Sequence, residues 1–133
     1  MNFKIYTLGH PLAKFYLDAI KEYEKRLSRY CKISHTHFKN LDALQKMLSP
    51  KTYVIALSID SESLTSVEFA HKINTWGISG TSDITFIIGV NEFSAKELLC
   101  ITPLQTDLGL CATLLVEQIY RGYRILNNQP YHK

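Results

Sequence analysis

The chain has 133 residues, of which 46% are hydrophobic and 20% charged, with a formal net charge of +3. These values fit an ordinary folded protein, and we expect a single domain over residues 1–133 that buries roughly two-thirds of its unfolded surface. No apolar run approaches the roughly 20 residues that a membrane span needs, and residues 1–6 lack the apolar block of a secretory signal. We therefore expect a cytoplasmic protein that uses no membrane.

The cysteines limit the covalent and metal chemistry of the chain. Cys31, Cys100 and Cys111 are odd in number and contain no Cys-x-x-Cys pair. This pattern argues against a disulfide framework and against a zinc site. We expect three reduced, buried thiols and no bound metal.

The first third of the chain predicts two strands that flank a long helix. Residues 3–8 alternate like a strand, and residues 12–29 carry apolar side chains at helical spacing. Residues 31–38 form the second predicted strand, on which His35 and His37 share one face. This pair could begin a metal site, but without a third ligand nearby a half-exposed edge strand is favoured.

The middle of the chain predicts a short helix at residues 41–47 and a buried strand at residues 53–57. A capping box at residues 65–68 opens a helix that Gly77 is expected to end. Residues 84–89 form a second apolar strand. Gly89 at its end fits either a plain turn or a point where a ligand nears the backbone.

The last third predicts a helix of about two turns from a capping box at residues 94–97. A brief strand near residues 100–104 and a final helix over residues 108–126 follow. The alternation of strands and helices indicates an α/β fold with a mostly parallel sheet and helices on both faces. Ligands of such folds bind at the carboxyl ends of strands, here after Leu57, Gly89 and Leu104.

The end of the chain concentrates groups that hold protons or anions. Glu117 and Arg121 are spaced for an intrahelical ion pair, although Arg121 also suits a phosphate or carbonyl oxygen. Tyr131 and His132 fit either a mobile tip or a placed tail, and Pro130 just before them favours the latter. Common nucleotide-binding and hydrolase motifs are absent from the sequence.

Basic residues gather near both ends of the chain. They either form two solvated helix faces or, if the fold brings them together, a patch that neutralises phosphates. The residues are Lys21, Lys25, Arg26, Arg29, Lys32, Arg121, Arg124 and Lys133.

Together these stretches resemble the RlmH family of SPOUT-class enzymes, which methylate a pseudouridine of large-subunit ribosomal RNA. The similarity covers residues 3–8, 23–27, 54–57, 82–89, 117–121 and 131–133. Its most specific part is the Glu-Gln-x-Tyr-Arg motif that ends at Arg121, followed about ten residues later by Tyr131 and His132.

The resemblance implies an α/β fold with a C-terminal trefoil knot, an exception to the rule that chains do not thread their own loops. It also implies a homodimer in which the tail of one subunit completes the site of the other. The cofactor would be S-adenosylmethionine, and the substrate N3 of a pseudouridine on an assembled ribosome. The implied cofactor-binding residues are Leu57, Gly89, Ile101, Thr102, Pro103, Leu104, Gln105 and Thr106.

The residues suit this chemistry, because methyl transfer from a sulfonium requires an aligned nucleophile that becomes anionic as the bond forms. Under this interpretation the catalytic residues are Arg121, Tyr131 and His132. Tyr131 or His132 takes or relays the proton, and Arg121 stabilises charge on a carbonyl oxygen. RNA phosphates would be held by Lys21, Lys25, Arg26, Arg29, Arg124 and Lys133.

The chain departs from the family pattern on the cofactor side. Val90 stands at a usual glycine, and Leu108 and Ala112 replace a usual histidine and arginine. Two alternatives therefore stay open: a knotted homolog that binds RNA without catalysis, and a SPOUT RNA methyltransferase with another target. A cleft filled by Val90 and Phe93 would favour the binder, and an open cleft at Gly89 the enzyme.

Overall fold

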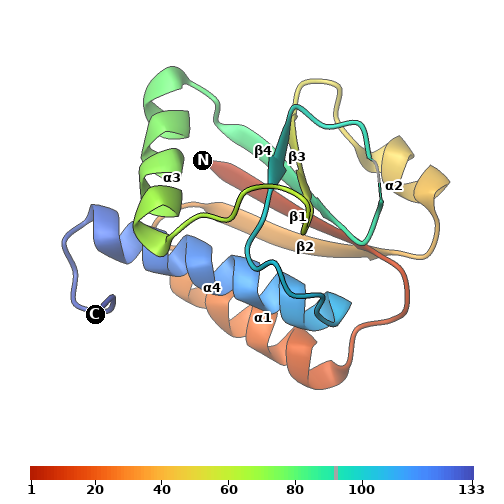
Figure 1. The fold of residues 1–133 in the computed structure, drawn as a ribbon, viewed down its shortest axis with the longest axis horizontal. Helices are drawn as coiled ribbons and strands as arrows, with labels where there is room; N and C mark the ends of the chain where they lie inside the picture. The colour runs from red at the N-terminus through yellow and green to blue at the C-terminus, as the bar shows by residue number, and fades with distance from the viewer. Residues whose placement is uncertain (92) are drawn as a thin grey trace.

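The computed structural model describes residues 1–91 and 93–133, and over these residues the chain forms five strands and four helices. Within the same residues, no helix combines the length and apolar character needed to cross a membrane. Figure 1 shows the arrangement. The elements are β1 (Asn2–Leu8), α1 (Lys14–Leu27), β2 (Lys32–Phe38), α2 (Leu41–Met47), β3 (Tyr53–Leu57), α3 (Ser66–Ser79), β4 (Asp83–Ile88), β5 (Glu97–Leu99) and α4 (Leu108–Leu126).

The strands form one parallel sheet in the order β2-β1-β4-β3-β5. Phe3 pairs with Ile33 on one side and with Ile84 on the other, so β1 and β4 occupy the centre. Because every strand runs the same way, all the carboxyl ends meet at one edge of the sheet. The predicted α/β class and parallel sheet are confirmed.

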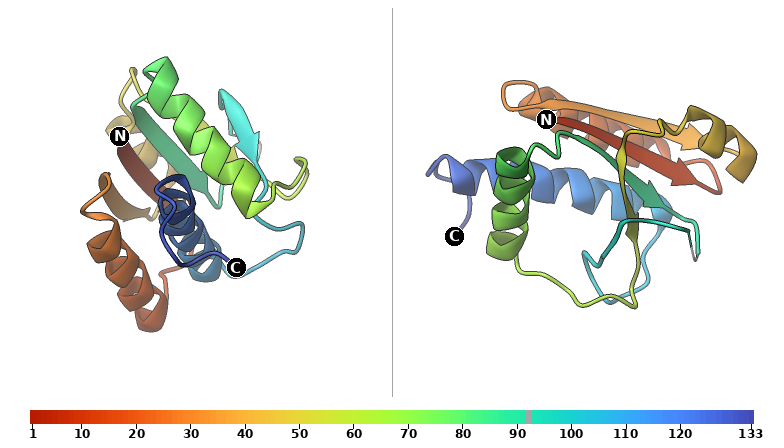
Figure 2. Two further views of the ribbon diagram at one scale, coloured as in Figure 1. Left: turned by 90° about the vertical axis from the view of Figure 1, so that its left-hand side faces the viewer. Right: turned by 90° about the horizontal axis from the view of Figure 1, so that it is seen from above.

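Helices cover both faces of the sheet, but unequally. α1, α3 and α4 enclose the main core on one face, where Phe3, Ile5 and Phe86 are fully buried. α2 covers a smaller cluster on the other face, around Tyr6 and Leu44. The views in Figure 2 show α1 and α4 lying side by side along the sheet, with α2 at the far end. Helices on both faces were predicted, and the structure adds that three of the four share one face.

Two predictions near residue 97 are wrong. The capping box at residues 94–97 does not begin a helix, and the strand lies at Glu97–Leu99 instead of residues 100–104. Glu97 pairs with Ile55, and the Lys96 amide donates to the Val54 carbonyl at 2.9 Å. Pairing with the edge of β3 provides long-range backbone partners here, and this tertiary contact overrides the local capping signal.

The capping box at the start of α3 is confirmed, because the Glu68 amide donates to the Thr65 hydroxyl at 3.1 Å and the Thr65 amide donates back to Glu68. Gly77 does not end the helix as predicted. The helix continues to Gly80, whose φ of +81° gives the left-handed C-cap. Gly77 lies inside the helix at a cost of roughly 0.5–1 kcal/mol relative to alanine, which the packing of α3 on the main core offsets.

His35 and His37 share one face of β2, as predicted, and they bind Thr7 through hydrogen bonds. Thr7 Oγ1 lies 2.8 Å from His35 Nε2 and 2.9 Å from His37 Nδ1. His37 Nε2 donates to the Gly9 carbonyl at 3.0 Å, so in neutral His37 the Nδ1 atom accepts from Thr7 and Thr7 accepts from His35. No group of three or more potential metal ligands occurs in the described part of the chain.

All three cysteines are free thiols. Burial raises the pKa of the Cys31 thiol to about 11 and also raises the pKa of Cys111. Both thiols therefore stay protonated near neutral pH. Cys100 is buried as predicted, whereas Cys31 and Cys111 are only partly buried, so that part of the prediction is wrong for these two.

The half-buried His35 predicts an acid-sensitive contribution to stability. Burial lowers the pKa of His35 below its ordinary 6.5, and the neighbouring His37 lowers it further. The neutral ring is therefore favoured by folding, so its contribution is full above pH 6.5 and declines as the pH falls toward the lowered value. In urea unfolding at pH 7.5 and 5.5, wild type should lose more stability between the two pH values than His35→Gln. Equal losses would contradict this assignment.

Candidate active site

A cavity of about 1030 Å³ opens where the strands end. Its wall is built from the residues after β1, β3 and β4, from the connection between β5 and α4, and from the first turn of α4. This volume lies at the upper end of the range for small-molecule sites, so a nucleoside-sized ligand fits within it. We call it the strand-end cavity.

Most residues predicted to hold a cofactor line the strand-end cavity. Pro103, which was also predicted, is not part of the described lining. The residues that do line it are Leu57, Gly89, Ile101, Thr102, Leu104, Gln105 and Thr106.

The sequence interpretation missed one wall, formed by residues 9–11 after β1. Residues 9–11 lie between the first predicted strand and the first predicted helix, where no local pattern indicates a binding role. Because β1 lies at the centre of the sheet, the turn after it must face the same edge as Gly89. The order of the strands in the sheet, which the sequence alone did not provide, was needed to predict this wall.

Gly89 brings two backbone segments together at the base of the strand-end cavity. Its φ of +95° belongs to the left-handed region, and a Cβ on it would lie 2.2 Å from the Leu8 carbonyl oxygen. No side chain fits at that distance, so glycine is required by both conformation and space. The close approach observed at Gly89 is between two backbone segments, and the approach of a ligand to this glycine stays a prediction.

The three departures from the family pattern leave the strand-end cavity open. Val90 lines it but packs with Phe93 against the small cluster around Tyr6 on the other face. Leu108 lies against the backbone of Gly9 and Gly89, with its methyl carbons 3.5 and 3.1 Å from where Cβ atoms would be. Ala112 is fully buried in the main core. The filled cleft expected for a binder without catalysis is not found.

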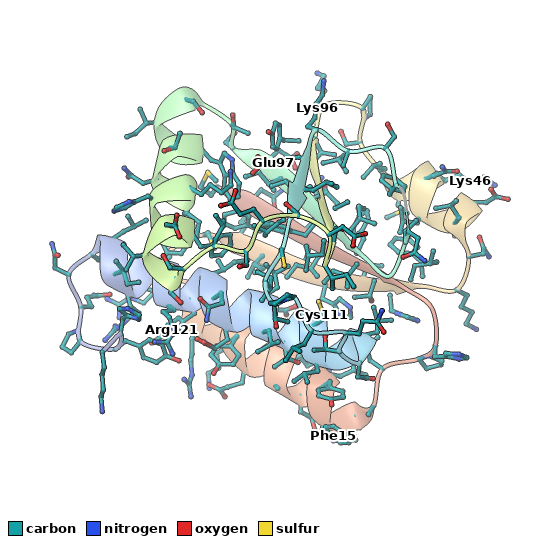
Figure 3. All side chains as sticks on the ribbon, viewed as in Figure 1. Phe15, Lys46, Lys96, Glu97, Cys111 and Arg121 are labelled. Carbon is teal, nitrogen blue, oxygen red and sulfur yellow. The ribbon has the colours of Figure 1, made fainter. Side chains whose placement is uncertain are left out.

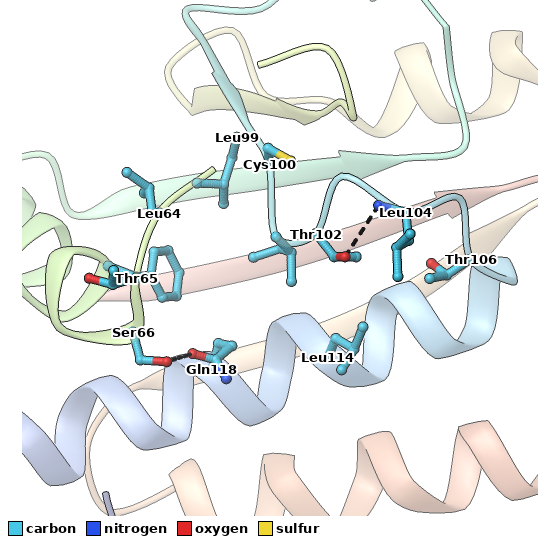
Figure 4. A pocket seen from close by; sticks show the side chains of 12 residues that line it. Leu64, Thr65, Ser66, Leu99, Cys100, Thr102, Leu104, Thr106, Leu114 and Gln118 are labelled. Carbon is cyan, nitrogen blue, oxygen red and sulfur yellow. Dashed lines mark hydrogen bonds between the residues drawn. The ribbon is translucent and has the colours of Figure 1, made fainter. Parts of the chain in front are cut away.

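A second cavity of about 350 Å³ lies on the other side of the 101–106 segment, between the start of α3 and the middle of α4 (Figure 4). There the Ser66 hydroxyl donates to Gln118 at 2.7 Å, and the Leu104 amide donates to Thr102 Oγ1 at 3.3 Å. Thr102 and Leu104 line both cavities. The segment predicted to hold the cofactor is thus a thin wall between two hollows.

Arg121, Tyr131 and His132 come together at the other end of α4, and we call them the tail cluster. Arg121 Nε donates to Glu117 Oε1 at 2.9 Å, as the ion-pair reading predicted. Its NH1 atom lies 3.1 Å from His132 Nδ1, and its guanidinium carbon is 4.8 Å from the centre of the Tyr131 ring. Arg121 therefore contacts both Tyr131 and His132.

The tail is placed against the body of the protein. Arg124 NH2 donates to the Pro130 carbonyl at 3.0 Å, and the Tyr131 ring packs edge-on against Tyr120 with centres 5.0 Å apart. Burial, followed by a hydrogen bond with Tyr23, raises the pKa of Tyr131 to about 12. Tyr131 is therefore a neutral phenol at physiological pH.

The strand-end cavity and the tail cluster do not meet within one chain. Cys111 lines the cavity near the beginning of α4, whereas Arg121 lies near its end, as Figure 3 shows. A helix rises roughly 1.5 Å per residue, so Leu108 and Arg121 are about 20 Å apart along the axis. Two halves of the predicted site are therefore held at opposite ends of one helix.

The basic residues of α1 and α4 lie together in part. The Arg26 guanidinium carbon is 5.9 Å from the centre of the Tyr120 ring, and Arg124 NH1 lies 3.4 Å from the Tyr30 hydroxyl. These contacts join the ends of the two helices into one basic surface. Lys21 and Lys25 are exposed on α1, Arg29 is exposed in the turn just after α1, and Lys133 is exposed at the end of the tail.

Comparison with known proteins identifies the family. The sequence profile described as "Predicted SPOUT methyltransferase" matches residues 1–132. The chain belongs to the SPOUT methyltransferase family. It is therefore a methyltransferase, and SPOUT membership implies the trefoil knot that the sequence led us to expect. Figure 1 shows the β3–α3 connection crossing the segment after β5, where Ser63 and Cys100 form a bridge.

Relatives of this SPOUT protein carry a more specific name. "Ribosomal RNA large subunit methyltransferase H 1" of Thermoanaerobacter sp. strain X514 is 47% identical over 133 residues, covering all of both chains. Proteins named "Ribosomal RNA large subunit methyltransferase H" from Clostridium tetani and Clostridium beijerinckii are 36% and 33% identical over 159 positions, again covering all of both chains. The resemblance to the RlmH family is confirmed, and the Thermoanaerobacter relative matches this chain over its full 133 residues.

Gly89 and Gly77 offer a matched pair of substitutions. Gly89→Ala must move the Leu8 carbonyl and adopt a strained φ, and should lower the free energy of unfolding by about 2 kcal/mol or more. Gly77→Ala meets nothing within 4 Å inside α3 and should raise it by roughly 0.5–1 kcal/mol. Chemical denaturation measures both, and a Gly89→Ala protein of wild-type stability would refute the close approach.

Proposed function

We propose that this SPOUT protein transfers a methyl group from S-adenosylmethionine to N3 of a pseudouridine in large-subunit ribosomal RNA, on assembled ribosomes, as a single-domain homodimer. The observation that carries the proposal is the pairing of a nucleoside-sized cavity with a cationic, aromatic tail cluster in a chain whose full-length relatives are named ribosomal RNA large subunit methyltransferases.

The strand-end cavity suits the methyl donor. Backbone groups reach it after Leu57, at Gly89 and along the 101–106 segment, and no Cβ obstructs Gly89. Backbone donors and acceptors beside apolar side chains are what recognition of an adenosyl group requires. When bound, this donor supplies a methyl group on a sulfonium, and the residues of the cavity hold and orient it.

The tail cluster suits the nucleotide that receives the methyl group. As the N3 proton leaves, negative charge spreads onto the two carbonyl oxygens of the base, and Arg121 is a permanent cation that can stabilise it. Because Arg121 donates to His132 Nδ1, the neutral imidazole carries its hydrogen on Nε2. His132 and the neutral Tyr131 therefore offer donors to a base carbonyl, and His132 would relay a proton only after its bond to Arg121 opens.

The separation along α4 argues for a site shared between two subunits. A two-fold axis that packs two chains with their α4 helices antiparallel would carry each tail cluster to the partner's strand-end cavity. Large apolar side chains are exposed near the strand-end cavity: Phe15 by 67%, Leu104 by 71% and Leu110 by 36%. Apolar groups gathered near a functional cavity are typical of a subunit interface.

The basic surface suits RNA. Exposed lysines on α1 bind phosphates without reading sequence, and this orients the RNA over the tail cluster. The remaining alternatives make different predictions. An RNA binder without catalysis would bind ribosomes in a salt-sensitive way and fail to bind the donor, and a methyltransferase with another target would label a different nucleotide.

The proposal is tested with ribosomes that lack the modification and with labelled S-adenosylmethionine. Wild type should bind the donor in calorimetric titration and label one pseudouridine at N3, located by mass spectrometry. Arg121→Ala should slow transfer by about 100-fold or more with little change in donor affinity, because it removes a cation that acts on the developing charge.

Lys46→Ala is the control, because Lys46 is an exposed cation on α2, across the sheet from α4. It should keep the wild-type rate. Donor binding that is undetectable with well-folded wild type would contradict the proposed function. An Arg121→Ala protein of full rate would contradict the role given to the tail cluster.

A further inference from the structure

Aromatic rings and guanidinium groups alternate where the carboxyl-terminal ends of α1 and α4 lie together. Each of four arginines has its guanidinium carbon within 6 Å of a tyrosine ring centre. Such contacts hold a planar cation against a planar ring. The arginines are Arg26, Arg29, Arg121 and Arg124, and the rings are those of Tyr23, Tyr30, Tyr120 and Tyr131.

Arg26 bridges two of these rings. Its guanidinium carbon lies 5.4 Å from the centre of the Tyr23 ring and 5.9 Å from that of Tyr120, and the two ring centres are 6.0 Å apart. The side chain is 45% exposed, so part of the guanidinium surface stays open to solvent beside these rings. The Tyr120 ring also supports Tyr131, so Arg26 shares one aromatic ring with the tail cluster.

The charge around Arg26 favours a base over a phosphate. Arg26 Nε donates to Glu22 Oε2 at 2.9 Å, and this carboxylate offsets the positive charge and would repel a phosphate. Stacking of an uncharged base on the outer face of the guanidinium carries no such penalty. Glu22 also restricts the rotation of the side chain, so the stacking face is oriented before RNA binds.

We propose that Arg26, supported by Tyr23 and Tyr120, is a stacking platform for an unpaired base of the RNA, next to the nucleotide that the tail cluster receives. The proposal rests on the proposed function. It adds a contact by which the protein distinguishes single-stranded from double-stranded RNA. Unpaired bases in RNA loops are commonly held on aromatic rings or guanidinium planes. The platform would favour an RNA loop in which the base next to the target nucleotide is extruded, over a continuous RNA helix.

Three substitutions at Arg26 separate stacking from phosphate binding. Arg26→Lys keeps the charge and loses the planar face, Arg26→Trp keeps a planar face and loses the charge, and Arg26→Ala loses both. Ribosome binding is measured by co-sedimentation at several salt concentrations, and methylation by wild type is measured in parallel. Circular dichroism confirms that each variant is folded, which the exposure of Arg26 leads us to expect.

Stacking predicts that Arg26→Lys and Arg26→Ala weaken ribosome binding by about 10-fold or more, whereas Arg26→Trp stays within a few-fold of wild type. Lys25→Ala is the comparison, because it removes a plain phosphate contact on the same helix. It should reduce the dependence of ribosome binding on salt concentration. Retention by Arg26→Lys with loss in Arg26→Trp would assign Arg26 to a phosphate and overturn the platform.

Two further outcomes would also overturn it. Equal losses in all three Arg26 variants would show that a planar face is not what matters, and no loss in any of them would remove Arg26 from the interface. Ribosomes bound but never methylated by wild type would count against the proposed function alone. Failure of wild type to bind ribosomes would reject both proposals.

Discussion

The rigid length of α4 is the constraint on which the proposed site depends. Leu108 anchors its first turn against the backbone of Gly9 and Gly89, where β1 and β4 end. At its other end, Arg121 and Arg124 hold the tail by hydrogen bonds to His132 and Pro130. A helix fixed at both ends cannot shorten, so the strand-end cavity and the tail cluster stay about 20 Å apart in each chain.

That separation gives a physical reason for assembly. A donor in the strand-end cavity and a base at the tail cluster of the same chain are too far apart to react, because transfer needs the two atoms in contact. Two antiparallel copies of α4 would place each tail beside the partner's cavity. In the proposed dimer the knot and the partner would have separate roles: the knotted segment would shape the cavity, and the partner would supply the charge.

The sequence predicted the elements whose signal is local. Continuous apolar runs marked β3 and β4, and the capping box at Thr65 marked the start of α3. The prediction failed where long-range pairing determines the secondary structure, because Glu97 becomes part of a strand only by pairing with Ile55. In the same way, seven of the eight expected cofactor residues line the cavity, but the wall at Gly9 follows from strand order, which no local pattern contains.

The central claim is that each site draws on two subunits, and a mixed dimer tests it most directly. Arg121→Ala damages the tail cluster, and Ser58→Trp puts a large side chain at a residue that lines the strand-end cavity. The two variants, carrying different affinity tags, are co-expressed, and dimers that carry both tags are isolated. Each variant alone should be inactive, whereas the mixed dimer should regain about half of the wild-type transfer rate, because one of its two shared sites is intact. A mixed dimer as inactive as its parents, or the absence of any mixed dimer, would contradict the account.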